Sequence, residues 1–127
     1  MDYTITNIGL LVQDLQSVVE FYRNAFNLTF KQKSSQFVEF NSNGATLFLW
    51  EWSHLEQHLG KEAMSRVKHP FMAAIYCPTP AQVDEAYTHL LDKGTEFIAP
   101  PQDWPWRARA AYFVDPEGYI WELYSWI

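Results

Sequence analysis

Hydrophobic and polar positions follow the same order in the two halves of the chain. A short apolar run at residues 8–12 predicts a strand, and apolar residues spaced three and four apart over 15–26 predict a helix after it. Asp14 stands at the expected N-cap of that helix. In the second half an apolar run at 73–77 precedes another helical pattern, with Thr79 as the expected cap. A strand followed by an amphipathic helix is therefore predicted twice.

Three further strands are expected after each helix. The candidates are short runs rich in aromatic and β-branched residues, and a turn sequence separates the last two strands of each half. In the first half the expected strands are 28–33, 36–40 and 45–52, with the turn at 41–44. In the second half they are 96–98, 109–114 and 119–126, with the turn at 115–118. Each half is thus predicted to be a βαβββ unit.

The repeat predicts one α+β domain that spans the whole chain. The first repeat is expected at 1–52 and the second at 69–127, with a connector at 53–68 between them. Within the connector, Ser53 and Glu56 have the spacing of a capping box, which predicts the start of a short helix.

Composition narrows the function before any motif is considered. The formal charge is −6, and no basic cluster is present, which argues against nucleic acid as a partner. No apolar run has membrane-spanning length, and no leader pattern opens the sequence, so we expect a soluble, unexported protein. Cys77 is the only cysteine, which excludes an internal disulfide and favours the cytoplasm. Aromatic residues make up 17% of the chain, with six Trp, and such a surplus often lines a pocket or an interface.

The chain resembles the vicinal oxygen chelate superfamily, also called the glyoxalase, bleomycin-resistance and dioxygenase group. The resemblance rests on five places along nearly the whole chain: Asn7–Asp14, Phe21–Tyr22, Trp106, Tyr112–Gly118 and Trp121–Tyr124. It implies that the two βαβββ repeats pair into a curved mixed sheet around a central cleft. It also implies a homodimer. The fold hosts many chemistries, so the resemblance is far less specific for activity.

Metal-using members of this family place ligands at the start of the first strand and at the end of the fourth strand of each half. Carried onto this chain, those positions are Asn7, Phe48, Met72 and Glu122. Only Glu122 is a strong ligand type, because an amide is weak, a thioether is too soft and a phenyl ring offers no donor. We therefore expect no divalent metal and no other cofactor.

The histidines offer one other route to a metal site. His54 and His58 are four residues apart, which places them on one face of a helix. No third ligand stands nearby in the sequence, so we expect two solvated side chains in the connector. His69 could reach the ligand position of Met72 only if the register slipped, and the alignment of the two helices argues against this.

Strand alternation predicts what fills the cleft. If Glu122 faces the concave side, its neighbours two residues away do so too, and the same reasoning applies to the fourth strand of the first half. The connection at 100–107 should add rings and a guanidinium at the mouth. Prolines around Trp104 favour its exposure, whereas Trp106 is equally well read as a structural wedge. The candidate ligand-binding residues are Asn7, Phe48, Trp50, Met72, Trp104, Trp106, Arg107, Tyr112, Glu122 and Tyr124.

Glu122 lies in an otherwise apolar and aromatic run, where an isolated carboxylate would be costly to bury. Two explanations remain open from the sequence. The carboxylate forms a salt bridge with Arg107 or Arg109, or it recognises a cationic or hydrogen-bonding group of a ligand. In a dry site its pKa would rise, and Glu122 could then act as an acid or a base. No other catalytic residue is predicted.

Three functions follow from these observations. The favoured one is a metal-independent binding protein similar to bleomycin-type resistance proteins, which stacks a small planar aromatic or cationic molecule in an aromatic cleft. The alternative is a glyoxalase-like lyase or isomerase, or a dioxygenase, with a degenerate or unorthodox metal site or with metal-free chemistry at Glu122. The third is a subunit or sensor whose cleft receives a partner peptide.

Overall fold

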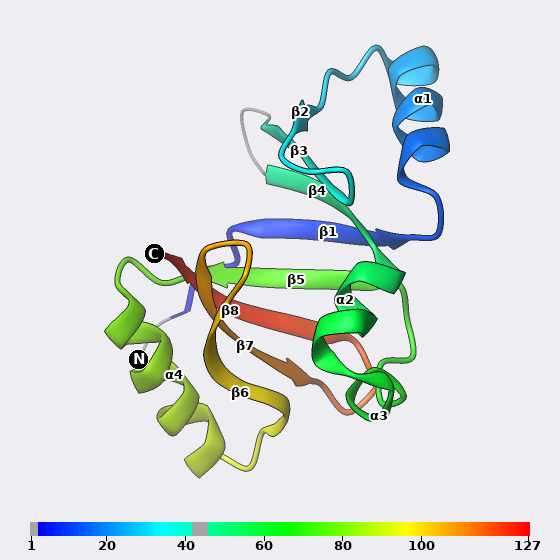
Figure 1. Cartoon of the computed structure of the whole chain (residues 1–127). Helices are drawn as coiled ribbons and strands as arrows, with labels where there is room; N and C mark the ends of the chain where they lie inside the picture. The colour runs from blue at the N-terminus through cyan, green and yellow to red at the C-terminus, as the bar shows by residue number, and fades with distance from the viewer. Residues whose placement is uncertain (1–2, 42–45) are drawn as a thin grey trace.

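The computed structural model describes residues 3–41 and 46–127, and its elements follow the predicted order (Figure 1). The first half consists of β1 (Asn7–Val12), α1 (Leu15–Phe26), β2 (Lys31–Gln32), β3 (Phe37–Asn41) and β4 (Thr46–Glu51). Two short helices follow, α2 (Trp52–Leu59) and α3 (Lys61–Met64). The second half consists of β5 (Phe71–Tyr76), α4 (Pro80–Asp92), β6 (Glu96–Trp104), β7 (Ala108–Val114) and β8 (Ile120–Trp126). The two βαβββ units are confirmed. Most of the turn expected at 41–44 lies outside the described residues.

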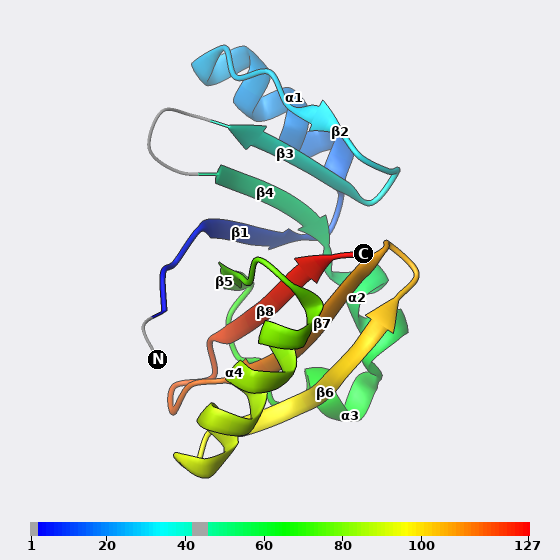
Figure 2. The ribbon, with the colours of Figure 1, turned by 90° about the vertical axis from the view of Figure 1, so that its left-hand side faces the viewer.

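The eight strands form one curved, unclosed mixed sheet, in the order β2-β3-β4-β1-β5-β8-β7-β6 (Figure 2). The halves meet where β1 and β5 pair antiparallel. On either side of this junction, β1 pairs parallel with β4 and β5 pairs parallel with β8. Each half therefore contributes its first and fourth strands to the centre of the sheet, as the predicted fold requires.

Side chains alternate between the two faces of the sheet, as the two-residue period of a strand dictates. Along β4, Phe48 and Trp50 belong to the core cluster that contains the buried residues of α2 and α3, whereas Leu49 packs beneath α1. Along β8, Tyr124 joins the first cluster and Leu123 packs beneath α4. The helices α1 and α4 thus cover one face, and the opposite face carries the aromatic residues.

The caps of the two long helices are as predicted. The Asp14 side chain accepts a hydrogen bond from the backbone N–H of Ser17 at 3.4 Å. Thr79 forms a complete capping box with Gln82, in which the Thr79 hydroxyl accepts from the Gln82 N–H and the Gln82 side chain accepts from the Thr79 N–H. These short-range bonds satisfy backbone donors that have no partner within the helix.

The predicted capping box in the connector is wrong. Helix α2 begins at Trp52, so Ser53 lies inside the helix and makes no cap, and Glu51 is the N-cap residue. The helical stretch also breaks at Gly60, where φ is 96°, and α3 starts anew after it. Leu55 of α2 is fully buried in the core. This packing of the helix sets where α2 begins, because it outweighs the local capping preference of Ser53.

β2 and β6 differ most from the expected strand lengths. β2 has only two residues, whereas 28–33 was expected. β6 extends to Trp104 and includes Pro100 and Pro101, which the sequence pattern assigned to a loop. Because β6 is an edge strand whose pairing with β7 shifts register after Phe97 and Ala99, prolines that donate no hydrogen bond are tolerated there.

No helix in the described ranges, 3–41 and 46–127, is long and apolar enough to cross a membrane.

Candidate functional site

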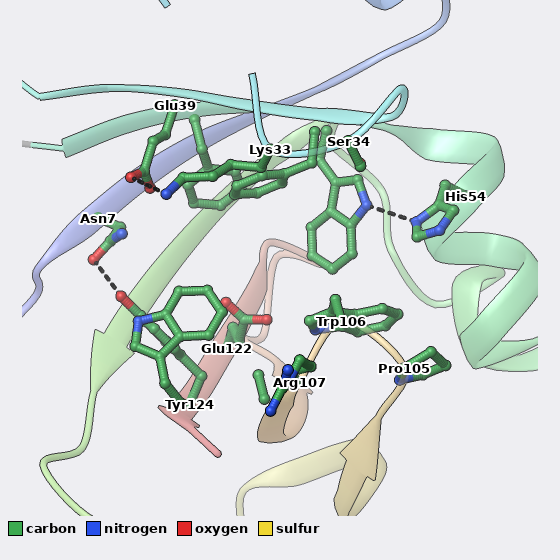
Figure 3. A pocket seen from close by; sticks show the side chains of 15 residues that line it. Asn7, Lys33, Ser34, Glu39, His54, Pro105, Trp106, Arg107, Glu122 and Tyr124 are labelled. Atoms are coloured by element: carbon green, nitrogen blue, oxygen red, sulfur yellow. Dashed lines mark hydrogen bonds and ion pairs between the residues drawn. The ribbon is translucent and has the colours of Figure 1, made fainter. Parts of the chain in front are cut away.

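A cavity of about 480 Å³ opens on the aromatic face of the sheet (Figure 3). Strands from both halves line it, together with the start of α2 and the connection between β6 and β7. Seven of the ten predicted ligand-binding residues lie in its wall: Asn7, Phe48, Trp50, Trp106, Arg107, Glu122 and Tyr124. The structure therefore brings together residues that are up to 117 positions apart in the chain.

The other three candidates, Met72, Trp104 and Tyr112, lie behind this wall. Met72 and Tyr112 are fully buried, and Trp104 is 6% exposed. The expectation that prolines would expose Trp104 is wrong. Its indole N–H donates to the backbone oxygen of Ala110 at 3.0 Å, and its ring stacks on Trp106 with 5.3 Å between centroids. The extension of β6 carries Trp104 into the core, so it supports the ring of Trp106 from behind.

Several cavity residues were missed by the sequence analysis. Phe37 and Glu39 of β3 lie opposite Trp50 and Phe48 of β4, and therefore on the same face. Lys33 also lines the cavity and forms an ion pair with Glu39 at 3.3 Å. The sequence did contain a signal for these two residues, because Phe37 and Glu39 alternate with the buried Val38 and so share one face of the strand. The other lining residues that were not predicted are Ser34, His54, Pro105, Ala108 and Trp126.

Glu122 is 8% exposed, and its carboxylate accepts a hydrogen bond from the Tyr112 hydroxyl. The two residues lie directly opposite each other on β8 and β7. Of the two explanations left open by the sequence, the salt bridge is wrong for Arg109, which pairs with Asp84 at 2.9 Å and with Asp103 at 3.1 Å. Among the described residues Glu122 has no ion pair, with Arg107 or any other base. A neutral phenol is thus its protein partner.

The buried position changes the acidity of Glu122. Burial raises the pKa of its carboxyl group to about 7, and the hydrogen bond from Tyr112 opposes this rise. Burial and the nearby carboxylate also raise the pKa of Tyr112 well above its usual value, so its hydroxyl stays protonated and remains a donor. Near neutral pH the site therefore holds a carboxyl group that can be neutral or charged at little cost.

A second polar contact joins the two halves across the cavity. The Tyr124 hydroxyl donates to the side-chain oxygen of Asn7 at 3.1 Å. Burial raises the pKa of Tyr124 to about 12, and the charge of Glu122 adds to this effect. The phenol is therefore protonated under all ordinary conditions, and the amide oxygen of Asn7 already has a donor.

The sequence predicted that His54 and His58 would be solvated, and this is wrong. Helix α2, which carries both residues, packs at the end of the cavity. His54 and His58 are both half-buried and lie against the ring of Trp106. The indole N–H of Trp50 donates to Nδ1 of His54 at 3.0 Å, and Nδ1 of His58 donates to the backbone oxygen of His54 at 2.9 Å. Burial lowers the pKa of His54, His58 lowers it further, and Glu51 raises it. His54 is thus neutral at pH 7, with Nδ1 as an acceptor.

The residues at the four metal-ligand positions of the family do not suit a divalent metal. At the four equivalent positions, Phe48 and Met72 are 3% and 0% exposed in the apolar core. Asn7 and Glu122 are engaged by the two tyrosine hydroxyls. Within residues 3–41 and 46–127, no group of three or more His, Cys, Asp and Glu side chains could hold a metal ion. The absence of a cofactor stays a prediction.

Comparison with known proteins shows the family to which the chain belongs. The Glyoxalase/Bleomycin resistance protein/Dioxygenase superfamily matches residues 4–123, and the chain belongs to that superfamily. The uncharacterized protein YraH of Bacillus subtilis (strain 168) is similar over nearly its whole length. The two sequences are 26% identical over 124 residues, which are 95% of this chain and 97% of YraH.

Solved structures support the same fold. The structure of the NAD-dependent benzaldehyde dehydrogenase from Legionella pneumophila matches with a TM-score of 0.78 and 21% identity, covering 94% of this chain and 97% of that one. The Mn(II)-bound glyoxalase from Novosphingobium aromaticivorans matches with a TM-score of 0.62 and 16% identity, covering 95% of this chain and 38% of that one. At these identities the similarity shows the fold alone, and activity must be argued from the site.

Proposed function

We propose that the protein binds a small planar molecule in the aromatic cavity without using a metal, in the manner of bleomycin-type resistance proteins. One observation carries this proposal: six aromatic rings surround a single buried carboxylate in a cavity of about 480 Å³. The rings are Phe37, Phe48, Trp50, Trp106, Tyr124 and Trp126.

The shape of the wall supports binding of a flat molecule. Trp50 meets Trp106 edge to face, with 5.2 Å between ring centroids, and both rings are fixed from behind. Trp104 stacks on Trp106, and His54 accepts the indole N–H of Trp50. Rings held in this way lose little freedom when a ligand binds, so stacking contributes more to affinity.

The carboxyl group of Glu122 supports a ligand with a cationic or N–H group. Its pKa of about 7 reflects a charge that the cavity solvates poorly. A cation or hydrogen-bond donor beside it would compensate for the lost water, whereas a purely apolar molecule would leave it uncompensated. A flat cation would also interact favourably with the faces of the surrounding rings.

Titration with 9-aminoacridine, a flat cation, tests this function. We expect saturable quenching of Trp emission and a dissociation constant that weakens about tenfold or more in Glu122→Gln, because a charge-assisted hydrogen bond is lost. Glu117→Gln is the matched control, since Glu117 is exposed in the turn before β8. Absence of binding, or equal binding by the two variants, would contradict the proposal.

The aromatic wall has its own control pair. Trp50→Phe should weaken binding, because Trp50 lines the cavity. Trp121→Phe should not, because Trp121 is on the opposite face of β8, where it stacks on Phe113. If both variants weakened binding equally, the ligand would not occupy this cavity.

A second candidate function is metal-free proton transfer by Glu122. The observation that favours it is the same pKa of about 7, which matches what general acid or base catalysis needs at neutral pH. The test is exchange of a C–H proton next to a carbonyl for deuterium in a panel of bound keto compounds, followed by NMR. No exchange above that of Glu122→Gln would exclude this role for the compounds tested.

Two family-based expectations remain as proposals. The first is a lyase, isomerase or dioxygenase with an unorthodox metal site. Such a protein would retain stoichiometric zinc, nickel, manganese or iron after purification, and the Glu122→Ala variant would lack the metal. Elemental analysis of both proteins measures the metal content. A homodimer is proposed from the family resemblance, and light scattering coupled to size-exclusion chromatography would give the mass in solution.

A further inference from the structure

Arg107 occupies an unusual backbone position at the rim of the cavity. It ends the three-residue connection between β6 and β7, where Trp104 pairs with Ala108. Its φ is 66°, in the left-handed region. Two hydrogen bonds fix this conformation, because the Arg107 N–H donates to the oxygen of Trp104 and its own oxygen accepts from the N–H of Ile127, both at 3.0 Å.

Glycine is the residue that this position favours. Three-residue hairpin connections commonly end in a left-handed residue, and a bulky side chain is strained there. Backbone strain of this kind is concentrated at functional sites. An arginine at this position therefore indicates that its side chain has a function.

The side chain of Arg107 is exposed, lines the cavity and lies beside Trp106 (Figure 3). Within residues 3–41 and 46–127, its guanidinium forms no ion pair. Lys33, the other cation of the cavity wall, is neutralised by Glu39 at 3.3 Å. Arg109, two residues away, is held by two aspartates. Arg107 is thus the uncompensated positive charge of the cavity.

We infer that Arg107 binds a carboxylate on the ligand, so that the cavity selects planar ring compounds that also carry an acid group. The inference rests on the proposed function and names the class of ligand. A guanidinium offers a flat pair of donors that matches the two oxygens of a carboxylate. The ligand then presents its acid group to the exposed rim and an N–H group to Glu122 in the buried part of the cavity.

A matched pair of probes isolates this contact: 6-amino-2-naphthoate and its methyl ester. Both have the same flat rings and the same N–H donor, and only the first carries a negative charge. Titration calorimetry should show that the wild-type protein binds the acid about tenfold more tightly than the ester. In Arg107→Gln the preference should disappear through weaker binding of the acid, with the affinity for the ester unchanged.

Two further variants separate binding from folding. Arg107→Gly should also lose the preference for the acid, while its melting temperature stays equal or rises, because glycine adopts a positive φ without strain. Arg23→Gln is the control, because Arg23 is exposed in the last turn of α1, and it should keep the full preference.

The outcomes distinguish the two proposals. If the ester binds and the acid binds no better, or if Arg107→Gln keeps the preference, the inference about Arg107 is overturned and the proposed function stands. If neither compound binds the wild-type protein but 9-aminoacridine does, the inference about Arg107 is overturned and the proposed function stands. If 9-aminoacridine does not bind either, both are overturned.

Discussion

Replacing Glu122 with glutamine should stabilise the protein at alkaline pH and have little effect in acid. The carboxyl group is buried with a neutral phenol as its partner, so its charged form is poorly solvated in the folded state. Glutamine has nearly the same shape, its side-chain oxygen can accept the same hydrogen bond from Tyr112, and it cannot ionise.

The expected size of the effect follows from the pKa. The folded carboxyl has a pKa of about 7, against an ordinary value of 4.5, which corresponds to about 3 kcal/mol. The folded state holds this proton more tightly than the unfolded state does. Its contribution to stability is therefore complete below the ordinary pKa of 4.5 and is lost as the pH rises through about 7. The Gln variant does not undergo this loss.

Urea unfolding of the ligand-free proteins at about pH 5 and about pH 8.5 measures the effect. The free energy of unfolding of the variant, relative to the wild type, should increase by about 2–3 kcal/mol between these conditions. A difference of that size moves the melting temperature by about 10 °C in a domain of this length, so thermal scans provide an independent measurement. Equal m-values would show that the extent of unfolding is the same.

Glu117→Gln serves as the control, since it makes the same chemical change at an exposed side chain outside the cavity. If the difference between Glu122→Gln and the wild type were the same at both pH values, the carboxyl would titrate alike in the folded and unfolded states. The argument for a poorly solvated charge would then be wrong.

Three further results are expected. Tyr112→Phe should raise the pKa of Glu122 further, because the hydrogen bond from Tyr112 lowers that pKa in the wild type. It should also reduce the free energy of unfolding by about 1.5–3 kcal/mol at alkaline pH. NMR of the carboxyl group measures the pKa and urea unfolding the stability, and an unchanged pKa would contradict the contact. In Gly9→Ala the new Cβ would lie 2.1 Å from the ring of Phe48, so we expect a loss of about 1–3 kcal/mol by calorimetry, and an unchanged stability would show that the ring moves freely. The affinity for 9-aminoacridine should rise as the pH increases through about 7, where the buried carboxyl ionises, and a flat fluorescence-titration profile would refute charge recognition.

The fold was largely predictable because its signals are local. Apolar spacing indicates each strand and helix, and the caps at Asp14 and Thr79 act through bonds over three residues. Strand alternation correctly assigned Phe48, Trp50 and Tyr124 to the aromatic face. These features depend on neighbours in the sequence, and the structure has all of them.

The site was less predictable, because its contacts depend on pairing between strands. Glu39 reaches the cavity only because β3 and β4 pair in one register, which places it opposite Phe48. Likewise, the prolines of β6 suggested a loop that would expose Trp104, but edge pairing with β7 carries that ring into the core. Counting outward from the turn expected at 115–118 would have placed Tyr112 opposite Trp121. In the structure Asp115 lies opposite Tyr119, and this one-residue difference brings Tyr112 opposite Glu122.

The sequence by itself determined the two βαβββ units and the aromatic face. It also showed that the carboxylate of Glu122 lies in an apolar strand and needs a partner. Only the tertiary structure decided which partner that is. Two arginines close in sequence suggested a salt bridge, yet Arg109 is bound by aspartates on other elements and a tyrosine across the sheet satisfies Glu122. The physical reason is that a charge pairs with whatever lies nearest in space, and long-range strand register sets that distance.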